Sequence, residues 1–97
     1  MDALIEQAIH SRHVLEFTYQ GLHRIAEPQV FGYYDGKKQL LGFQITGQSR
    51  SGGLPAWRRY DVDRIIGLSI SHQTFSGPRP TLTGVDTNWD TIVARVK

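Results

Sequence analysis

The chain has 97 residues, enough for one domain with a hydrophobic core and too few for two. Its 39% hydrophobic and 21% charged residues are typical of a globular protein, and the absence of cysteine excludes disulfides and thiolate zinc sites. No apolar run is long enough to predict a membrane span, and the acidic N-terminus is unlike a signal peptide, so we expect a cytoplasmic protein.

The first predicted element is a helix over residues 2–11. Apolar residues recur at helical spacing there, and Asp2 stands where an N-cap is expected. The apolar set is Leu4, Ile5, Ala8 and Ile9.

After this helix the apolar period changes to two, which is typical of half-buried strands. Gly21 marks a first turn, and Asp35-Gly36 is the best hairpin signal in the chain. Pro28 predicts an edge or a bend within the second strand. Five strands are predicted near residues 13–20, 23–34, 38–46, 56–60 and 67–72, with a single helical turn over residues 61–65.

This order of elements predicts a mostly β fold. A helix followed by five short, bent antiparallel strands describes a small SH3-like or Sm-like barrel. Residues 1–75 would form the barrel domain, and residues 76–97 a C-terminal extension that packs on it. The spacing of Trp89, Ile92, Val93 and Val96 predicts a helical tail, docked on the barrel or in the groove of a partner.

The basic residues gather in the middle of the chain. Residues 37–64 carry six basic and two acidic residues, whereas residues 1–36 carry two basic and five acidic ones. This asymmetry arises by chance or marks a surface for an acidic partner. The segment contains a polar Ser/Gly loop with Ser49 and Arg50, followed by Trp57-Arg58-Arg59-Tyr60. Arginine beside aromatic rings suits oxyanions and stacked bases.

Strand alternation separates the residues of this basic strand. Trp57 and Arg59 share one face, while Arg58 and Tyr60 share the other. Each face thus carries one aromatic ring and one guanidinium, so the pattern leaves open which face is exposed.

The sequence carries no catalytic or cofactor signature. Gly47-Gln48-Ser49-Arg50-Ser51 begins like a nucleophile elbow but has serine at its fifth position, and Gly53 stands where a phosphate loop needs lysine. His10 and His13 have no third metal ligand at suitable spacing. We therefore expect a binding module, not an enzyme, without cofactor or metal.

The segment Arg58–Ile65 resembles the R-x-F-R-x-D-R-I segment of WYL domains. Tyr19 and Gly21, Arg24 and Glu27-Pro28 are similar to that family's early Tyr-x-Gly, Arg and Pro positions, and Leu40–Phe43 to the strand of its name motif. The resemblance covers residues 4–75. It implies an Sm-like barrel of the kind found in bacterial transcription regulators and defence-associated proteins, which senses nucleotides or single-stranded nucleic acid through basic residues.

The chain departs from the family at three positions. Lys38 and Gln39 stand where the family has Trp and Tyr, and Asp61 replaces its second arginine. The family usually adds an N-terminal DNA-binding winged helix, whereas only Met1, Asp2 and Ala3 precede Leu4, the first apolar residue of the predicted helix here. The resemblance therefore implies a stand-alone sensor or adaptor, or a divergent copy without ligand binding.

Two functions remain open at this point. One is binding of nucleic acid or a nucleotide, and the other is a protein–protein adaptor or homo-oligomer joined by barrel edges. The predicted ligand-binding residues are Arg58, Arg64, Arg50, Ser49, Tyr60 and Arg59. In the competing structural account, Arg64 pairs with Asp61 or Asp63 to hold the turn, and Arg58 is merely solvated.

Overall fold

The predicted N-terminal helix is confirmed in the computed structural model, which describes residues 1–97. Helix α1 spans Asp2–Ser11 and buries Ile5, Ala8 and Ile9. The predicted capping role of Asp2 is wrong: the N-cap is Met1, and Asp2 accepts a hydrogen bond of 2.8 Å from Lys38 Nζ. No helix in the structure has the length and apolar character that a membrane span requires.

Five strands follow α1 close to their predicted positions. They are β1 (His13–Tyr19), β2 (Leu22–Tyr34), β3 (Lys37–Gly47), β4 (Ala56–Asp61) and β5 (Ile66–Thr74), with the 3₁₀ turn η1 (Val62–Arg64) before β5. The Asp35-Gly36 turn has φ values of 50° and 75°, which is the left-handed geometry of a two-residue hairpin. The predicted hairpin is therefore confirmed.

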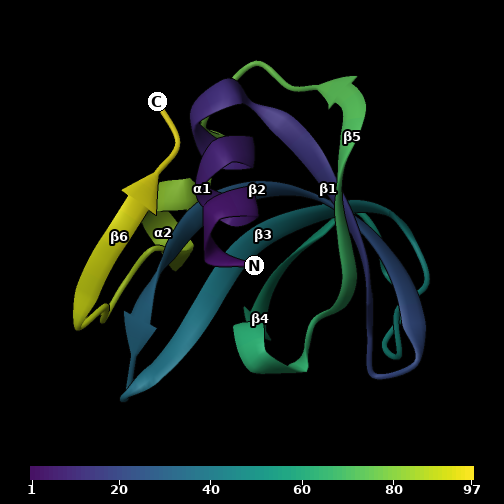
Figure 1. The fold of residues 1–97 in the computed structure, drawn as a ribbon, viewed down its shortest axis with the longest axis horizontal. Coiled ribbons are helices and arrows are strands. Elements are labelled where there is room, and N and C mark those ends of the chain that lie inside the picture. Colours follow the sequence, from purple (N-terminus) through teal and green to yellow (C-terminus); the bar gives the residue numbers. More distant parts are fainter.

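The strands form one antiparallel sheet in the order β4-β3-β2-β1-β5 (Figure 1). The mostly β fold is thus confirmed. No backbone ladder joins β4 to β5, so the sheet is open, and its closure into a barrel is not confirmed.

Strand β2 shares one of its edges between two partners. Its first part pairs with β1 up to Ala26, and its last part pairs with a sixth strand, β6 (Thr91–Arg95), from Val30 onward. Pro28 lies in the gap between these two ladders, beside a register shift against β3. The prediction of an edge or a bend at Pro28 corresponds to this interruption of one ladder in a central strand, where a residue without an N–H is tolerated.

Strand β6 corrects the prediction of a C-terminal helical tail. Trp89, Ile92, Val93 and Val96 fit a helical stripe, yet the segment is extended, and only a single turn, α2 (Leu82–Val85), precedes it. Thr91, Ile92 and Val93 are β-branched and favour a strand. The free edge of β2 supplies the backbone partners that such a strand needs.

Residues 76–97, the C-terminal extension, also contact the sheet through side chains. Arg79 forms a two-point ion pair with buried Glu27, with distances of 2.8 and 2.7 Å. Buried Gln29 accepts a hydrogen bond of 3.0 Å from the Arg79 backbone. Whether residue 75 is a domain boundary stays a prediction.

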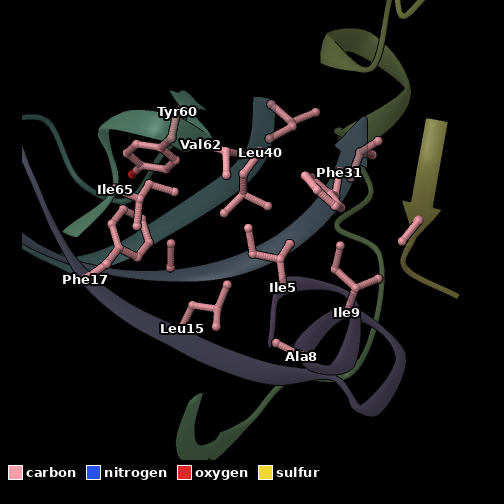
Figure 2. Packing of buried hydrophobic residues seen from close by; sticks show 14 of the residues in the cluster. Ile5, Ala8, Ile9, Leu15, Phe17, Phe31, Leu40, Tyr60, Val62 and Ile65 are labelled. Atoms are coloured by element: carbon pink, nitrogen blue, oxygen red, sulfur yellow. The ribbon is translucent and has the colours of Figure 1, made fainter. Parts of the chain in front are cut away.

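The hydrophobic core lies between α1 and the concave side of the sheet (Figure 2). It joins Ile5 and Ile9 of α1 to Leu15 and Phe17 of β1 and to Tyr60 of β4. The ring of Tyr60 meets the edge of Phe17 at 4.9 Å between centroids. Tyr60 is thus a core residue, and its position decides which face of β4 points inward.

We predict that Gly32→Ala destabilises the pairing of β2 with β6. A methyl group at Gly32 would lie 2.2 Å from the Thr91 carbonyl oxygen, so β6 would have to shift. Overpacking of this kind costs about 1–3 kcal/mol of unfolding free energy. Urea denaturation measures this loss of unfolding free energy.

The control is Gly84→Ala, whose added methyl group meets nothing within 4 Å. It should leave the unfolding free energy unchanged or slightly higher. Equal effects of the two substitutions would contradict the close approach of β6 to β2.

Candidate anion-binding site

The β1–β2 turn and the β3–β4 loop lie side by side at one end of the sheet (Figure 1). Residues of both line a pocket of about 240 Å³. The backbone N–H of Gln48 in the loop donates a hydrogen bond of 2.7 Å to the carbonyl of His23, at the start of β2. We call this 240 Å³ pocket the arginine pocket. It is lined by Tyr19, Gln20, Arg24, Ser49, Arg50, Ser51, Arg58, Arg59 and Tyr60, with no acidic residue among them.

Arg24 is the residue at the base of this pocket. It is only 3% exposed, and it forms no salt bridge. Its guanidinium donates to neutral oxygens only: Gln44 Oε1 at 3.1 Å, the Tyr19 carbonyl at 3.3 Å and Gln20 Oε1 at 3.4 Å. The Nε atom has no partner. A buried charge is normally paired, so this cation lacks the counter-ion that its burial calls for.

Two tyrosine rings hold the guanidinium of Arg24. Its central carbon lies 5.7 Å from the Tyr19 ring centroid and 5.9 Å from that of Tyr60. The two rings meet edge to face at 5.0 Å. Both hydroxyl groups are engaged, that of Tyr60 with Gln44 Oε1 and that of Tyr19 with the backbone N–H of Asp61. The rings therefore stabilise the cation without neutralising it.

Arg58 reaches the pocket from β4 and holds the β3–β4 loop. Its Nη2 donates to Ser49 Oγ at 2.9 Å, Ser51 Oγ at 3.0 Å and the Gly52 carbonyl at 3.1 Å. These acceptors are neutral, so none of them offsets the charge of Arg58. The loop that carries the predicted ligand-binding residues Ser49 and Arg50 is thus bound to Arg58, which was predicted to bind the same ligand.

Arg64 lies outside the arginine pocket. It lines a neighbouring pocket of about 550 Å³ with Gln20, Gly21, Arg50 and Ile66. Arg50 and Gln20 line both pockets, so the two basic surfaces adjoin. Arg58 and Arg64 therefore belong to adjacent pockets and do not share one.

The structural alternative for Arg64 is not observed. Arg64 forms no salt bridge with Asp61 or Asp63. Asp61 instead accepts a hydrogen bond of 2.8 Å from Gln39 Nε2. The charge of Arg64 is therefore not used to hold the turn.

Comparisons with known proteins show the fold. The structure superimposes on part of the proteasome accessory factor B/C (PafBC) of Arthrobacter aurescens with a TM-score of 0.66. The match has 22% sequence identity and covers 88% of this chain but only 14% of PafBC. No family model matches the chain. No curated protein matches it either.

Arg59 has a different environment from its neighbours on β4. Its guanidinium lies on the opposite face, 4.7 Å from the Tyr34 ring centroid and 4.4 Å from that of Trp89. It donates to the carbonyls of Val85 and Thr87 in the C-terminal extension, at 3.2 and 2.9 Å. Burial lowers the pKa of Arg59. The side chain of Arg59 thus binds the extension, and its guanidinium does not point into the arginine pocket.

Sequence reasoning did not select Arg24 or Gln44 as site residues. Arg24 matched an arginine of the family resemblance, but it stands in an apolar strand far from the basic segment. Its role becomes visible only once Tyr19, Gln44 and Tyr60 are brought together from three strands. The signal that the sequence offered was an arginine at a position that matches the family resemblance.

Burial raises the pKa of the Tyr60 phenol to about 12, while the charges of Arg24 and Arg58 act to lower it. The unfolded tyrosine titrates near 10. Between these values the folded protein keeps a proton that the unfolded chain loses. The stability that this proton contributes is therefore complete below about pH 10 and is lost as pH rises toward 12, by at most about 1.4 kcal/mol per pH unit.

Urea denaturation across this alkaline range should show the loss in the wild type and a smaller loss in Tyr60→Phe. The difference between the two proteins is the measured quantity, because the other tyrosines and the lysines titrate in both. An identical alkaline decline would contradict the burial of the Tyr60 hydroxyl.

Proposed function

We propose that the chain is a non-enzymatic regulatory module of the WYL type that binds a phosphate-bearing ligand, a nucleotide or single-stranded nucleic acid. The observation that carries this proposal is the buried guanidinium of Arg24, which has no counter-ion and lines an open pocket. A structural arginine at such depth would be expected to pair with a carboxylate. An anionic ligand would supply the missing partner.

The pocket offers the donors that an oxyanion requires. Arg24, Arg50 and Arg58 line it with three cations. The serine hydroxyls that now accept from Arg58 can also donate to an anion. Charge-assisted hydrogen bonds in a partly buried site are about twice as strong as neutral ones, so a phosphate group gains most from this arrangement.

Tyr60 has a supporting role in this proposal. The ring is 1% exposed and is covered by Phe17, Tyr19 and Arg24. A base has no room to stack on it, in contrast to the contact that the sequence suggested. Tyr60 instead positions Arg24 and helps hold Gln44.

The regulatory assignment rests on two agreeing observations. The sequence resembles WYL domains at Arg58–Ile65, and the fold is shared with part of a proteasome accessory factor. From these two observations we infer that the module is a sensor that reports the presence of its ligand.

A second candidate function is self-association through sheet edges. Strands β4 and β5 are the two ends of the open sheet, and Ile66 on β5 is 67% exposed. Exposed edges of this kind pair readily with other chains. The salt dependence of association distinguishes the two functions, because an apolar subunit contact survives high ionic strength whereas phosphate binding weakens steeply.

The proposed function is tested by fluorescence anisotropy with a labelled single-stranded oligonucleotide at two salt concentrations. Arg58→Gln should weaken binding about tenfold or more and reduce the salt dependence, since one charge-assisted contact contributes about 1.5–3 kcal/mol. Arg64→Gln should have a smaller effect, because Arg64 lines only the neighbouring pocket.

The matched control is Arg12→Gln. Arg12 is exposed at the far end of β1 and makes one long side-chain hydrogen bond, of 3.5 Å to the Ser76 carbonyl. This variant should bind as the wild type does. Equal affinity of Arg58→Gln and the wild type, or equal losses in Arg58→Gln and Arg12→Gln, would refute the proposed site. Sizing chromatography of the same samples reports self-association.

A further inference from the structure

Gln44 is the residue that determines how Arg24 is held. It lies on β3 and is fully buried. Its Oε1 accepts hydrogen bonds of 3.1 Å from both Arg24 Nη1 and the Tyr60 hydroxyl. Its Nε2 donates to the carbonyls of Thr46 and Gln48, at 3.1 and 2.8 Å. Every donor and acceptor of the amide is thus used.

The two carbonyl partners fix which way the amide points. Carbonyl oxygens accept only, so the NH₂ group must face Thr46 and Gln48, and the oxygen must face Arg24. If a carboxylate replaced the amide, one of its oxygens would face the carbonyl oxygens of Thr46 and Gln48, and these acceptors would repel each other. The site therefore favours a neutral amide where a buried arginine would ordinarily have an acid.

We propose that Gln44 is a positioning residue that sets the charge selectivity of the arginine pocket, making it prefer a phosphate dianion to a carboxylate. The amide oxygen orients Arg24 and leaves its charge uncancelled. Arg24, Arg50 and Arg58 then line the pocket with no acidic residue to offset them. This inference rests on the proposed function and specifies the ligand group that the same site takes.

The size of the pocket agrees with a single phosphate group. Its volume of about 240 Å³ falls below the range of roughly 300–1,000 Å³ that is typical of pockets for whole small molecules. The remainder of a ligand would lie outside it, over the adjoining surface that Arg50 and Gln20 also line.

The test is an NMR titration at neutral pH with methyl phosphate, which is largely a dianion there, and with acetate. The wild type should bind methyl phosphate at least about tenfold more tightly than acetate, because the Coulomb energy scales with the ligand charge. In Gln44→Glu the added negative charge penalises a dianion twice as strongly as a monoanion. The ratio of the two affinities should therefore fall several-fold, which a merely structural defect would not produce.

Two further variants complete the design. Gln44→Met removes the acceptor without adding charge, so it should weaken both ligands by a similar factor and keep their ratio. Gln29→Glu places the same charge change at another fully buried glutamine, which contacts Gly77 and Arg79 outside the pocket, and should leave the ratio unchanged.

The outcomes distinguish this inference from the proposed function. Methyl phosphate binding with an affinity ratio unchanged in Gln44→Glu would overturn the role of Gln44 and leave the proposed function standing. If Gln44→Glu does not fold, wild-type affinities in Gln44→Met would overturn that role equally. A wild type that binds no methyl phosphate would refute the proposed function and this inference together.

Discussion

The candidate site depends on one buried cation that the protein itself does not neutralise. Arg24 is held by two tyrosine rings and by the amide oxygen of Gln44, all of which stabilise a guanidinium without cancelling its charge. Burying a charge in this way costs free energy that a carboxylate partner would offset. Elsewhere the chain does pair a buried charge, since the carboxylate of buried Glu27 forms a salt bridge with Arg79. The contrast between these two arginines makes Arg24 a candidate ligand-binding residue and Arg79 a structural one.

The two arginines of strand β4, Arg58 and Arg59, have different roles. Tyr60 must enter the core, so Arg58 on the same face is directed to the arginine pocket, and Arg59 is directed to the C-terminal extension. Trp57 shares the face of Arg59 and donates a hydrogen bond of 2.9 Å to Thr81 in that extension. The extension is also joined to the sheet by β6, which covers the edge of β2 that β1 leaves free. One strand therefore contacts both the candidate ligand site and the last segment of the chain.

The sequence predicted the elements whose signals are local, and it missed those that depend on distant partners. Period-two alternation and the Asp35-Gly36 turn placed the strands, because both patterns are properties of neighbouring residues. Strand β6 was mistaken for a helix, since Trp89, Ile92 and Val93 fit a helical stripe, and the segment becomes a strand through its pairing with the free edge of β2. The face of β4 that turns inward could not be derived, because each face carries one arginine and one aromatic ring. Arg24 was overlooked as a binding residue for a related reason: its lack of a counter-ion is a property of the folded protein.

The most direct test of a ligand-binding Arg24 is the NMR signal of its side-chain Nε–H group, followed while a nucleoside monophosphate is added. This nitrogen is buried and has no partner in the structure, so its signal reports a change in how the guanidinium is held when an anion binds. We expect the signals of Arg24 and Arg58 to shift together and to saturate, while that of Arg59, on the other face of β4, stays in place. An Arg24 signal that does not move at saturating ligand, or a shift confined to Arg59 or Arg79, would contradict the account.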